Sequence, residues 1–340
     1  MGFYLNSKKP YLLFQEDVHS AYFVDKSQIL QYLIPAVELT ENFPKKQGAE
    51  QGKSYRYICV TRPRRFGKTV MANMISSYFS RENDSSEIFR RLKAASLDGF
   101  RDHLNRHNVI HIMLNEMPRR CRSYDEYIRR IETRLLEDLK RAFPDVPIRE
   151  EDALWDAFNS IIEFGSGEKF IFILDEWDFI FHRDFVTDND KAEYIDFLSN
   201  LLKDQPYVEL AYMTGILPIA KYSSGSELNM FYEYTMAEEE AFSEYFGFTD
   251  DEVDELFRKY QSGRSSAGNV TREGLRIWYD GYYTKSGKQI YNPCAVVASL
   301  ANNNLENYWI NSGSNDEMFD DKNKKWYECQ VEVLRDRNGI

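Results

Sequence analysis

Short, continuously apolar runs alternate along the first two thirds of the chain with segments whose apolar residues recur every three or four positions. The apolar runs at 57–61, 109–114, 170–174 and 208–213 predict strands, and the helical spacing at 27–40, 68–80 and 123–143 predicts helices. The run FIFIL at 170–174 contains no polar position, which is typical of a strand covered on both faces. Strands that alternate with helices predict an α/β fold, in which helices flank a parallel sheet.

The pattern changes beyond about residue 238, where helical segments predominate. Thr249 and Glu252 form a capping-box signature at the start of one predicted helix. Further along, a hairpin is predicted across Ser286-Gly287, and a last helix is predicted near 293–302. We therefore expect a smaller, mostly helical domain to follow the α/β core.

Composition and charge narrow the class of protein. The 340 residues suggest about two domains, and the formal net charge of −12 disfavours long-range attraction of nucleic acid. A nucleic-acid contact would therefore need a local basic patch. The N-terminus has no apolar signal region, no apolar run is long enough for a membrane span, and the four cysteines form no C-x-x-C pair. These features predict a cytoplasmic protein without a membrane segment.

The segment Arg62-Pro63-Arg64-Arg65-Phe66-Gly67-Lys68-Thr69 joins a predicted strand to a predicted helix. In a phosphate-binding loop, backbone N–H groups at a helix N-terminus hold the anion, a lysine contacts the outer phosphates, and a Ser or Thr hydroxyl binds Mg²⁺. Gly67, Lys68 and Thr69 match that pattern, and Gly67 allows close approach of the backbone. The predicted nucleotide-binding residues are Arg64, Arg65, Phe66, Gly67, Lys68, Thr69 and Val70.

The surrounding sequence qualifies this prediction in two ways. Gly52-Lys53-Ser54 also matches the shortest form of the motif, but it lies in a polar loop before a strand, which is the wrong order. The full motif has Gly where Arg62 stands, and Pro63 favours an extended conformation for Arg62. The backbone N–H groups from Arg65 to Thr69 are not affected by this departure. We therefore expect ATP to bind at Gly67-Lys68-Thr69.

Acidic residues follow the apolar strand at 170–174 directly. Open α/β sheets bind ligands at the carboxyl ends of their strands, so we predict that Asp175 and Thr69 hold Mg²⁺ and that Glu176 polarises the attacking water. Thr214, which ends a later strand, is predicted to contact the γ-phosphate or the water, although a threonine before a glycine is also a simple turn signal. The predicted catalytic residues are thus Glu176, Lys68 and Thr214. Acids after a strand can instead cap the next element, but the order of loop and acids favours catalysis.

Two other clusters have weaker interpretations. Arg119-Arg120-Cys121-Arg122 is the densest basic cluster outside the loop, and it is either a solvated turn or a contact for nucleic acid or a protein partner. His103 and His107 are spaced four residues apart without a third ligand beside them, which favours a solvated helix face over a metal site.

Several segments together resemble the AAA-ATPase-like family of prokaryotic P-loop NTPases. The segments are FVDKS at 23–27, RPRRFGKT at 62–69, FILDEWD at 172–178, YMTGILPI at 212–219, WYDGY at 278–282 and YNP at 291–293. The resemblance covers about residues 2 to 313, and members of this family usually lack the first glycine of the loop. It implies an ATPase core, a winged-helix-like lid that carries 278–293, and a place for Asp25 near the adenine end of the nucleotide.

The resemblance also sets the expected organisation of the chain. We expect an ATPase core with an N-terminal helical segment at 1–237, a lid at 238–313 and a divergent tail at 314–340. Many relatives continue into a PD-(D/E)XK nuclease-like domain, which the tail does not resemble, so no nuclease activity is expected of it. The leading hypothesis is Mg²⁺-dependent ATP hydrolysis. The alternatives are a nucleotide-gated interaction module and the ATPase component of a DNA-processing system, either of them compatible with a homo-oligomer.

Overall fold

Five strands form the central sheet, and every hydrogen-bonded pair in it is parallel. The computed structural model describes residues 2–38, 56–222, 225–236, 241–263 and 268–308. The strand order is β2-β3-β4-β1-β5. The strands are β1 (Tyr57–Thr61), β2 (Asn108–Met113), β3 (Phe170–Asp175), β4 (Val208–Gly215) and β5 (Tyr232–Tyr234). The predicted parallel sheet is confirmed, with β5 as an additional strand.

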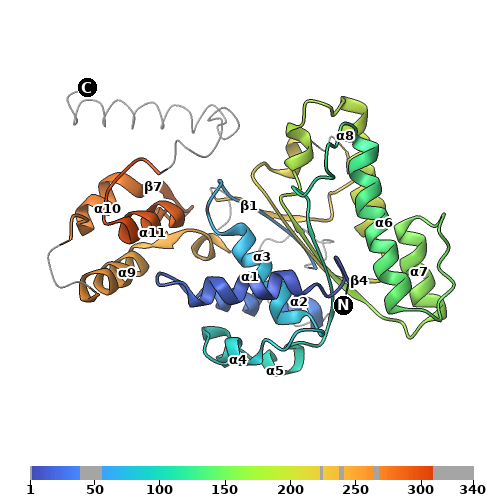
Figure 1. Cartoon of the computed structure of the whole chain (residues 1–340), viewed down its shortest axis with the longest axis horizontal. Coiled ribbons are helices and arrows are strands. Elements are labelled where there is room, and N and C mark those ends of the chain that lie inside the picture. Colours follow the sequence, from blue (N-terminus) through green and yellow to red (C-terminus); the bar gives the residue numbers. More distant parts are fainter. Residues whose placement is uncertain (1, 39–55, 223–224, 237–240, 264–267, 309–340) are drawn as a thin grey trace.

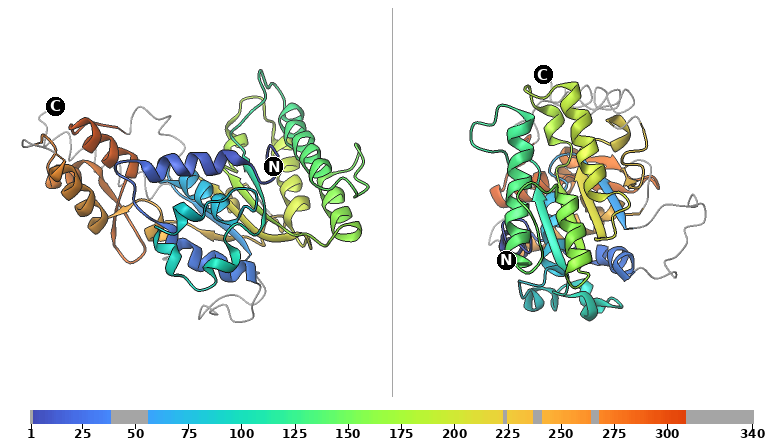
Figure 2. Two further views of the ribbon diagram at one scale, coloured as in Figure 1. Left: turned by 60° about the horizontal axis from the view of Figure 1, so that its bottom comes forward. Right: turned by 90° about the vertical axis from the view of Figure 1, so that its right-hand side faces the viewer.

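Alternate residues of β1, β2 and β3 face two different hydrophobic clusters. In β3, Phe170, Phe172 and Leu174 pack into the cluster formed with α6 (Tyr124–Ala142), α7 (Leu154–Phe164) and α8 (Asp188–Leu202). Ile171 and Ile173 pack into the cluster formed with α1 (Lys8–His19), α2 (Leu30–Glu38) and α3 (Lys68–Phe79). Figures 1 and 2 show these helices as a layer on each side of the sheet. The continuously apolar strand is thus covered on both faces, as the sequence predicts.

Three of the longer core helices were not expected from the hydrophobic pattern. Helices α7 and α8 are absent from the predicted elements, and so is α1, which packs along α3. In α1 polar and apolar residues are about equal in number, and only Pro10 and Phe14 are buried. The short helical elements of the core are α4 (Ser86–Phe89), α5 (Phe100–His103) and the 3₁₀ turns Ser27–Ile29, Lys93–Ser96, Phe179–His182, Ile219–Lys221 and Ser243–Tyr245.

A smaller unit follows, here called the C-terminal unit (described residues 248–263 and 268–308). It contains an antiparallel sheet of β6 (Phe248–Thr249), β8 (Gln289–Tyr291) and β7 (Asp280–Tyr283), with helices α9 (Asp250–Ser262), α10 (Arg272–Tyr279) and α11 (Pro293–Asn302). The capping box of Thr249 and Glu252 is present at the start of α9. These elements have their own hydrophobic cluster. The likeness to a winged helix stays a prediction.

Parts of the expected organisation fall outside the described residues. These are the boundary at 237/238, the Gly52-Lys53-Ser54 segment and the tail at 314–340. Phe242 and Phe246 belong to the hydrophobic cluster of α1, α2 and α3 rather than to that of the C-terminal unit. No helix among the described residues combines the length and the apolar character that crossing a membrane requires.

Candidate nucleotide site

The loop at 62–67 connects the carboxyl end of β1 to the first turn of α3, in the order that the sequence predicts. Gly67 is the N-cap of α3 with a φ of 84°, and Arg65 also has a left-handed φ of 67°. No side chain caps this helix N-terminus. The first N–H groups of a helix have no partner within the helix and carry its partial positive charge, so the loop and helix start suit an anion.

Lys68 is almost completely buried at the start of α3. Its Nζ donates hydrogen bonds of 2.9 Å to the carbonyl oxygens of both Arg62 and Pro63 in the same loop. Burial lowers the pKa of the ammonium, whereas the nearby carboxylates, Asp175 foremost, oppose that shift. The ammonium thus contacts neutral carbonyl oxygens, which anionic phosphate oxygens can replace as stronger acceptors.

Thr69 and Asp175 lie in direct contact, although they come from different elements. The Thr69 hydroxyl donates a 2.6 Å hydrogen bond to Oδ2 of Asp175, the last residue of β3. Hydroxyl and carboxylate oxygens are the ligands that Mg²⁺ prefers, and neighbouring oxygens around that ion are about 3 Å apart. The two side chains therefore fit a magnesium ion with only a small adjustment. The structure brings together the residues predicted to share the metal.

Thr214 connects the two acids that follow β3. It is fully buried, and its hydroxyl donates to Oδ1 of Asp175 and accepts a 3.3 Å hydrogen bond from the backbone N–H of Glu176. Its carbonyl accepts from the N–H of Trp177 at 2.9 Å. Thr214 therefore orients the segment that carries the acids. Its predicted contact with a phosphate or the water stays a prediction.

Glu176 has a left-handed backbone with a φ of 56°, directly after the buried Asp175. Burial raises the pKa of Glu176 and the charge of Asp175 adds to this shift, while Lys68 and a hydrogen bond with the Asn115 side chain oppose it. Asn115 follows β2, which pairs with β3, and the N–H of Leu114 donates to the Asp175 carbonyl at 2.9 Å. Sequence reasoning missed Asn115. Its position just after a strand that ends at the same edge was the signal available.

The other acid of this segment, Asp178, fixes the loop that follows β4. Its buried carboxylate accepts hydrogen bonds from the N–H groups of Ile216 (3.0 Å) and Leu217 (2.8 Å). It thus holds the loop after β4. At Gly215 a Cβ would lie 2.4 Å from the Trp177 ring, so this close approach requires glycine. The motif YMTGILPI is explained by these contacts with the segment after β3.

Arg62, which stands where the full motif has glycine, is buried. Its Nη1 donates to the carbonyls of Thr61 (2.8 Å) and Tyr234 (2.5 Å), and its guanidinium lies 5.2 Å from the centre of the Phe246 ring. Burial lowers its pKa to about 10, so the group stays charged at neutral pH. The arginine thereby fastens the start of the loop to β5.

The remaining loop residues have diverse surroundings. Arg64 and Arg65 are exposed. The Nη1 of Arg65 donates long hydrogen bonds to Cys294 Sγ (3.5 Å) and to the Tyr308 carbonyl (3.4 Å). Phe66 is buried, and its ring meets that of Tyr282 in the C-terminal unit. In this structure, then, neither the Arg65 nor the Phe66 side chain is turned toward the Thr69–Asp175 pair; both contact the C-terminal unit.

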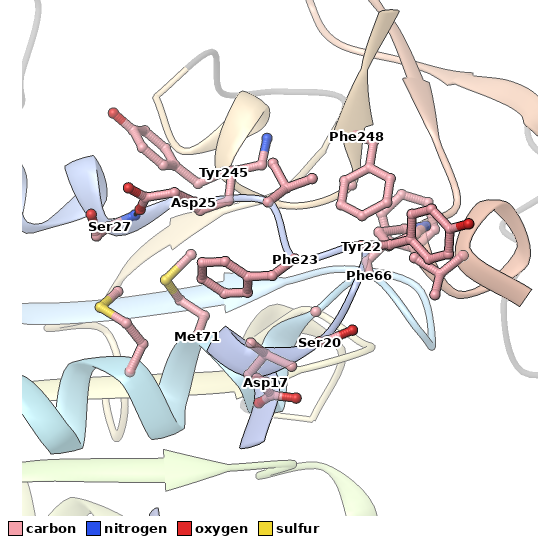
Figure 3. A pocket seen from close by; sticks show the side chains of 18 of the residues that line it. Asp17, Ser20, Tyr22, Phe23, Asp25, Ser27, Phe66, Met71, Tyr245 and Phe248 are labelled. Carbon is pink, nitrogen blue, oxygen red and sulfur yellow. Dashed lines mark hydrogen bonds between the residues drawn. The ribbon is translucent and has the colours of Figure 1, made fainter. Parts of the chain in front are cut away.

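An apolar pocket of about 200 Å³ opens beside the start of α3. Figure 3 shows Phe23 and Met71 on its wall, with Tyr22, Phe66 and Phe248 at one end. The lining also includes Gly67, Val70, Asp25, and Pro293 and Val297 from α11. The Asp25 carboxylate accepts from the N–H groups of Ser27 (2.8 Å) and Lys93 (2.6 Å), which stabilises the pocket wall. The pocket therefore lies between the core and the C-terminal unit, next to the loop.

Two clusters lie outside this site. Arg119, Arg120 and Arg122 are exposed on the loop between β2 and α6, as expected of a solvated turn. His103 and His107 are not simply a solvated face: their facing nitrogens are 2.9 Å apart, and their outer nitrogens contact Glu38 and Glu209. Within the described ranges, no group of three or more His, Cys, Asp or Glu residues could hold a metal ion.

Comparison with known proteins agrees with this geometry. Residues 49–224, just over half of the chain, match the AAA-ATPase-like family model, described as "Predicted AAA-ATPase". The chain belongs to this family. Among solved structures, it is similar to a Walker-type ATPase of Pyrococcus abyssi, with 13% sequence identity and a TM-score of 0.40 over 92% of this chain and 76% of that one. No curated protein matches the chain.

Proposed function

We propose that this member of the AAA-ATPase-like family binds ATP with Mg²⁺ and hydrolyses its terminal phosphoanhydride bond. The observation that carries the proposal is the 2.6 Å contact between Thr69 and Asp175, directly beside the buried ammonium of Lys68. One edge of the sheet would then provide two ligands for the metal, an ammonium to bind the phosphates and a glutamate, Glu176, to orient the water. Phosphoryl transfer depends on this combination of positioning and electrostatic stabilisation.

Binding would use the loop and the adjoining pocket. The phosphates would contact the N–H groups from Arg65 to Thr69, and Lys68 would exchange the carbonyls of Arg62 and Pro63 for phosphate oxygens. The base would enter the apolar pocket, because such pockets bury flat, weakly polar groups. The Asp25 carboxylate already accepts two backbone hydrogen bonds, so Asp25 would stabilise the pocket wall rather than contact the nucleotide.

Thr69 and Asp175 would hold the magnesium ion, which neutralises charge that develops on the phosphate oxygens. Glu176 would accept a hydrogen bond from the attacking water and so orient it. Thr214 would hold the backbone N–H of Glu176, and Asn115 would hold the Glu176 carboxylate. Both would therefore act on the water only through this glutamate. Both are positioning residues in this scheme.

The test separates binding from hydrolysis. Lys68→Ala is expected to abolish ATP binding, measured by titration with a fluorescent ATP analogue and Mg²⁺. Glu176→Gln is expected to keep binding and to lose hydrolysis, measured by phosphate release. Glu163→Gln, which changes an exposed acid of α7, is the matched control and should behave as the wild type. Unchanged turnover in Glu176→Gln would remove its catalytic role.

The same assay distinguishes the alternatives. Tight binding with turnover at background in the wild type would indicate a nucleotide-gated interaction module. Turnover that rises when duplex or single-stranded DNA is added would indicate a component that processes DNA. We favour hydrolysis because Glu176 is present at the metal-binding edge and is held there by Asn115 and Thr214.

A further inference from the structure

Phe66 is the one aromatic residue of the loop at 62–69, and its ring packs against the C-terminal unit. The ring is 1% exposed, although the preceding residues Arg64 and Arg65 are exposed. Its centre lies 4.7 Å from that of Tyr282 on β7, in an edge-to-face arrangement with an interplanar angle of 76°. Aromatic pairs in this geometry attract each other beyond the area that they bury. A residue of the WYDGY motif is thereby joined to the phosphate loop.

The space around the Phe66 ring is closely fitted. A Cβ at Gly247, where φ is 88°, would lie 3.2 Å from two atoms of the ring. The neighbouring Arg65 adds the contacts of its guanidinium to Cys294 and to the Tyr308 carbonyl. Those contacts are long and exposed, so the buried ring is the stronger attachment. The loop is therefore attached to the C-terminal unit immediately before Gly67.

The backbone of the loop explains why an attachment is needed. Arg65 and Gly67, on the two sides of Phe66, both have left-handed φ angles, of 67° and 84°. For a residue with a Cβ such as Arg65 this conformation is unfavourable and persists only where surrounding contacts maintain it. The local sequence alone does not favour this shape. The N–H groups that would face the phosphates depend on it.

We propose that Tyr282 is a positioning residue of the nucleotide site, because it holds Phe66 and thereby keeps the loop in its anion-binding shape. The inference rests on the proposed ATP binding, and it makes the C-terminal unit a part of the site rather than an attached module. By thermodynamic linkage the effect runs in both directions, so a bound nucleotide also stabilises the contact of the C-terminal unit with the loop.

Tyr282→Ala tests the proposal through affinity. We expect the variant to bind a fluorescent ATP analogue with Mg²⁺ about 10- to 100-fold more weakly, because the loop is no longer held in shape. Turnover at saturating ATP should change much less, since the groups around Asp175 are untouched. Tyr282→Phe keeps the aromatic ring and should bind the ATP analogue with the affinity of the wild type. Tyr283→Ala, which removes an exposed ring from the same strand, is the matched control and should bind as the wild type.

Amide hydrogen exchange in the nucleotide-free protein supplies a readout that does not require ATP binding. We expect faster exchange at 65–69 in Tyr282→Ala than in Tyr283→Ala, with unchanged exchange in the strands of the core. Circular dichroism and thermal unfolding identify a variant that fails to fold, and Phe66→Leu then tests the same contact from the other side. Equal affinity and equal exchange in folded Tyr282→Ala and wild type would overturn the proposal. If the wild type binds no ATP but exchange at 65–69 is still faster in Tyr282→Ala, only the proposed function is contradicted.

Discussion

The two sides of the candidate site are held in place by different parts of the molecule. On the acidic side, Asp175 and Glu176 are hydrogen-bonded by residues of the sheet edge itself, Thr214 near the end of β4 and Asn115 after β2. On the loop side, Phe66 is held by Tyr282 in the C-terminal unit. Strand register therefore places the acids, whereas a contact between distant segments places the loop.

This difference separates two kinds of effect. Neighbouring parallel strands end at one edge, so the residues after them meet as soon as the sheet is formed. The loop has no such partner at its tip and requires contacts from outside the sheet. We therefore expect substitutions on the acidic side to lower turnover and substitutions at the loop contact to lower affinity.

Asp175→Asn is expected to have the largest effect, because it removes the proposed charged ligand of the magnesium ion while keeping the size of the side chain. We expect turnover to fall by about 100-fold or more. Phosphate release measured over a series of Mg²⁺ concentrations checks this, with the exposed Asp145→Asn as the control. Turnover equal to that of the wild type would show that the acidic side is not the metal site.

Asn115→Ala should have a smaller effect on the same side. We expect turnover to fall by about 10-fold with ATP affinity nearly unchanged, as is typical when a partner of a functional carboxylate is removed. The Asn115 hydrogen bond lowers the pKa of Glu176, so its loss raises that pKa and moves the acid limb of the pH–rate profile upward. A rate profile with an unmoved acid limb would contradict the assigned contact.

Asp280→Asn probes the C-terminal unit and should have the smallest effect. Burial, with a contribution from Asp250, raises the pKa of Asp280 to about 6. The folded state thus binds this proton more tightly than the unfolded state, so the stability from this group falls as pH rises from about 4 to about 6. The side chain is partly exposed, so solvent screening limits the change to about 1 kcal/mol or less. Thermal unfolding at pH 5 and 7.5 should show a weaker pH dependence in Asp280→Asn; an undiminished one would contradict the raised pKa.

The parts of the fold that could be predicted are those that local patterns specify. The strands that carry Lys68 and Asp175 to their positions are buried apolar runs, and the start of α9 has the capping box of Thr249 and Glu252. The helix α1 was missed because it has no clear apolar face: about half of its residues are polar, and only Pro10 and Phe14 are buried. Its position depends on packing against α3 rather than on a strong pattern of its own.

The sequence by itself determined which residues could form a nucleotide site: a Gly-Lys-Thr segment between a strand and a helix, and acids at the end of an apolar strand. The tertiary structure alone decided that Thr69 contacts Asp175, that Asn115 contacts Glu176, and that Phe66 packs on Tyr282. The physical reason is that a short-range pattern specifies the conformation of a segment. Contacts between distant segments depend on strand order and on the packing of the whole chain.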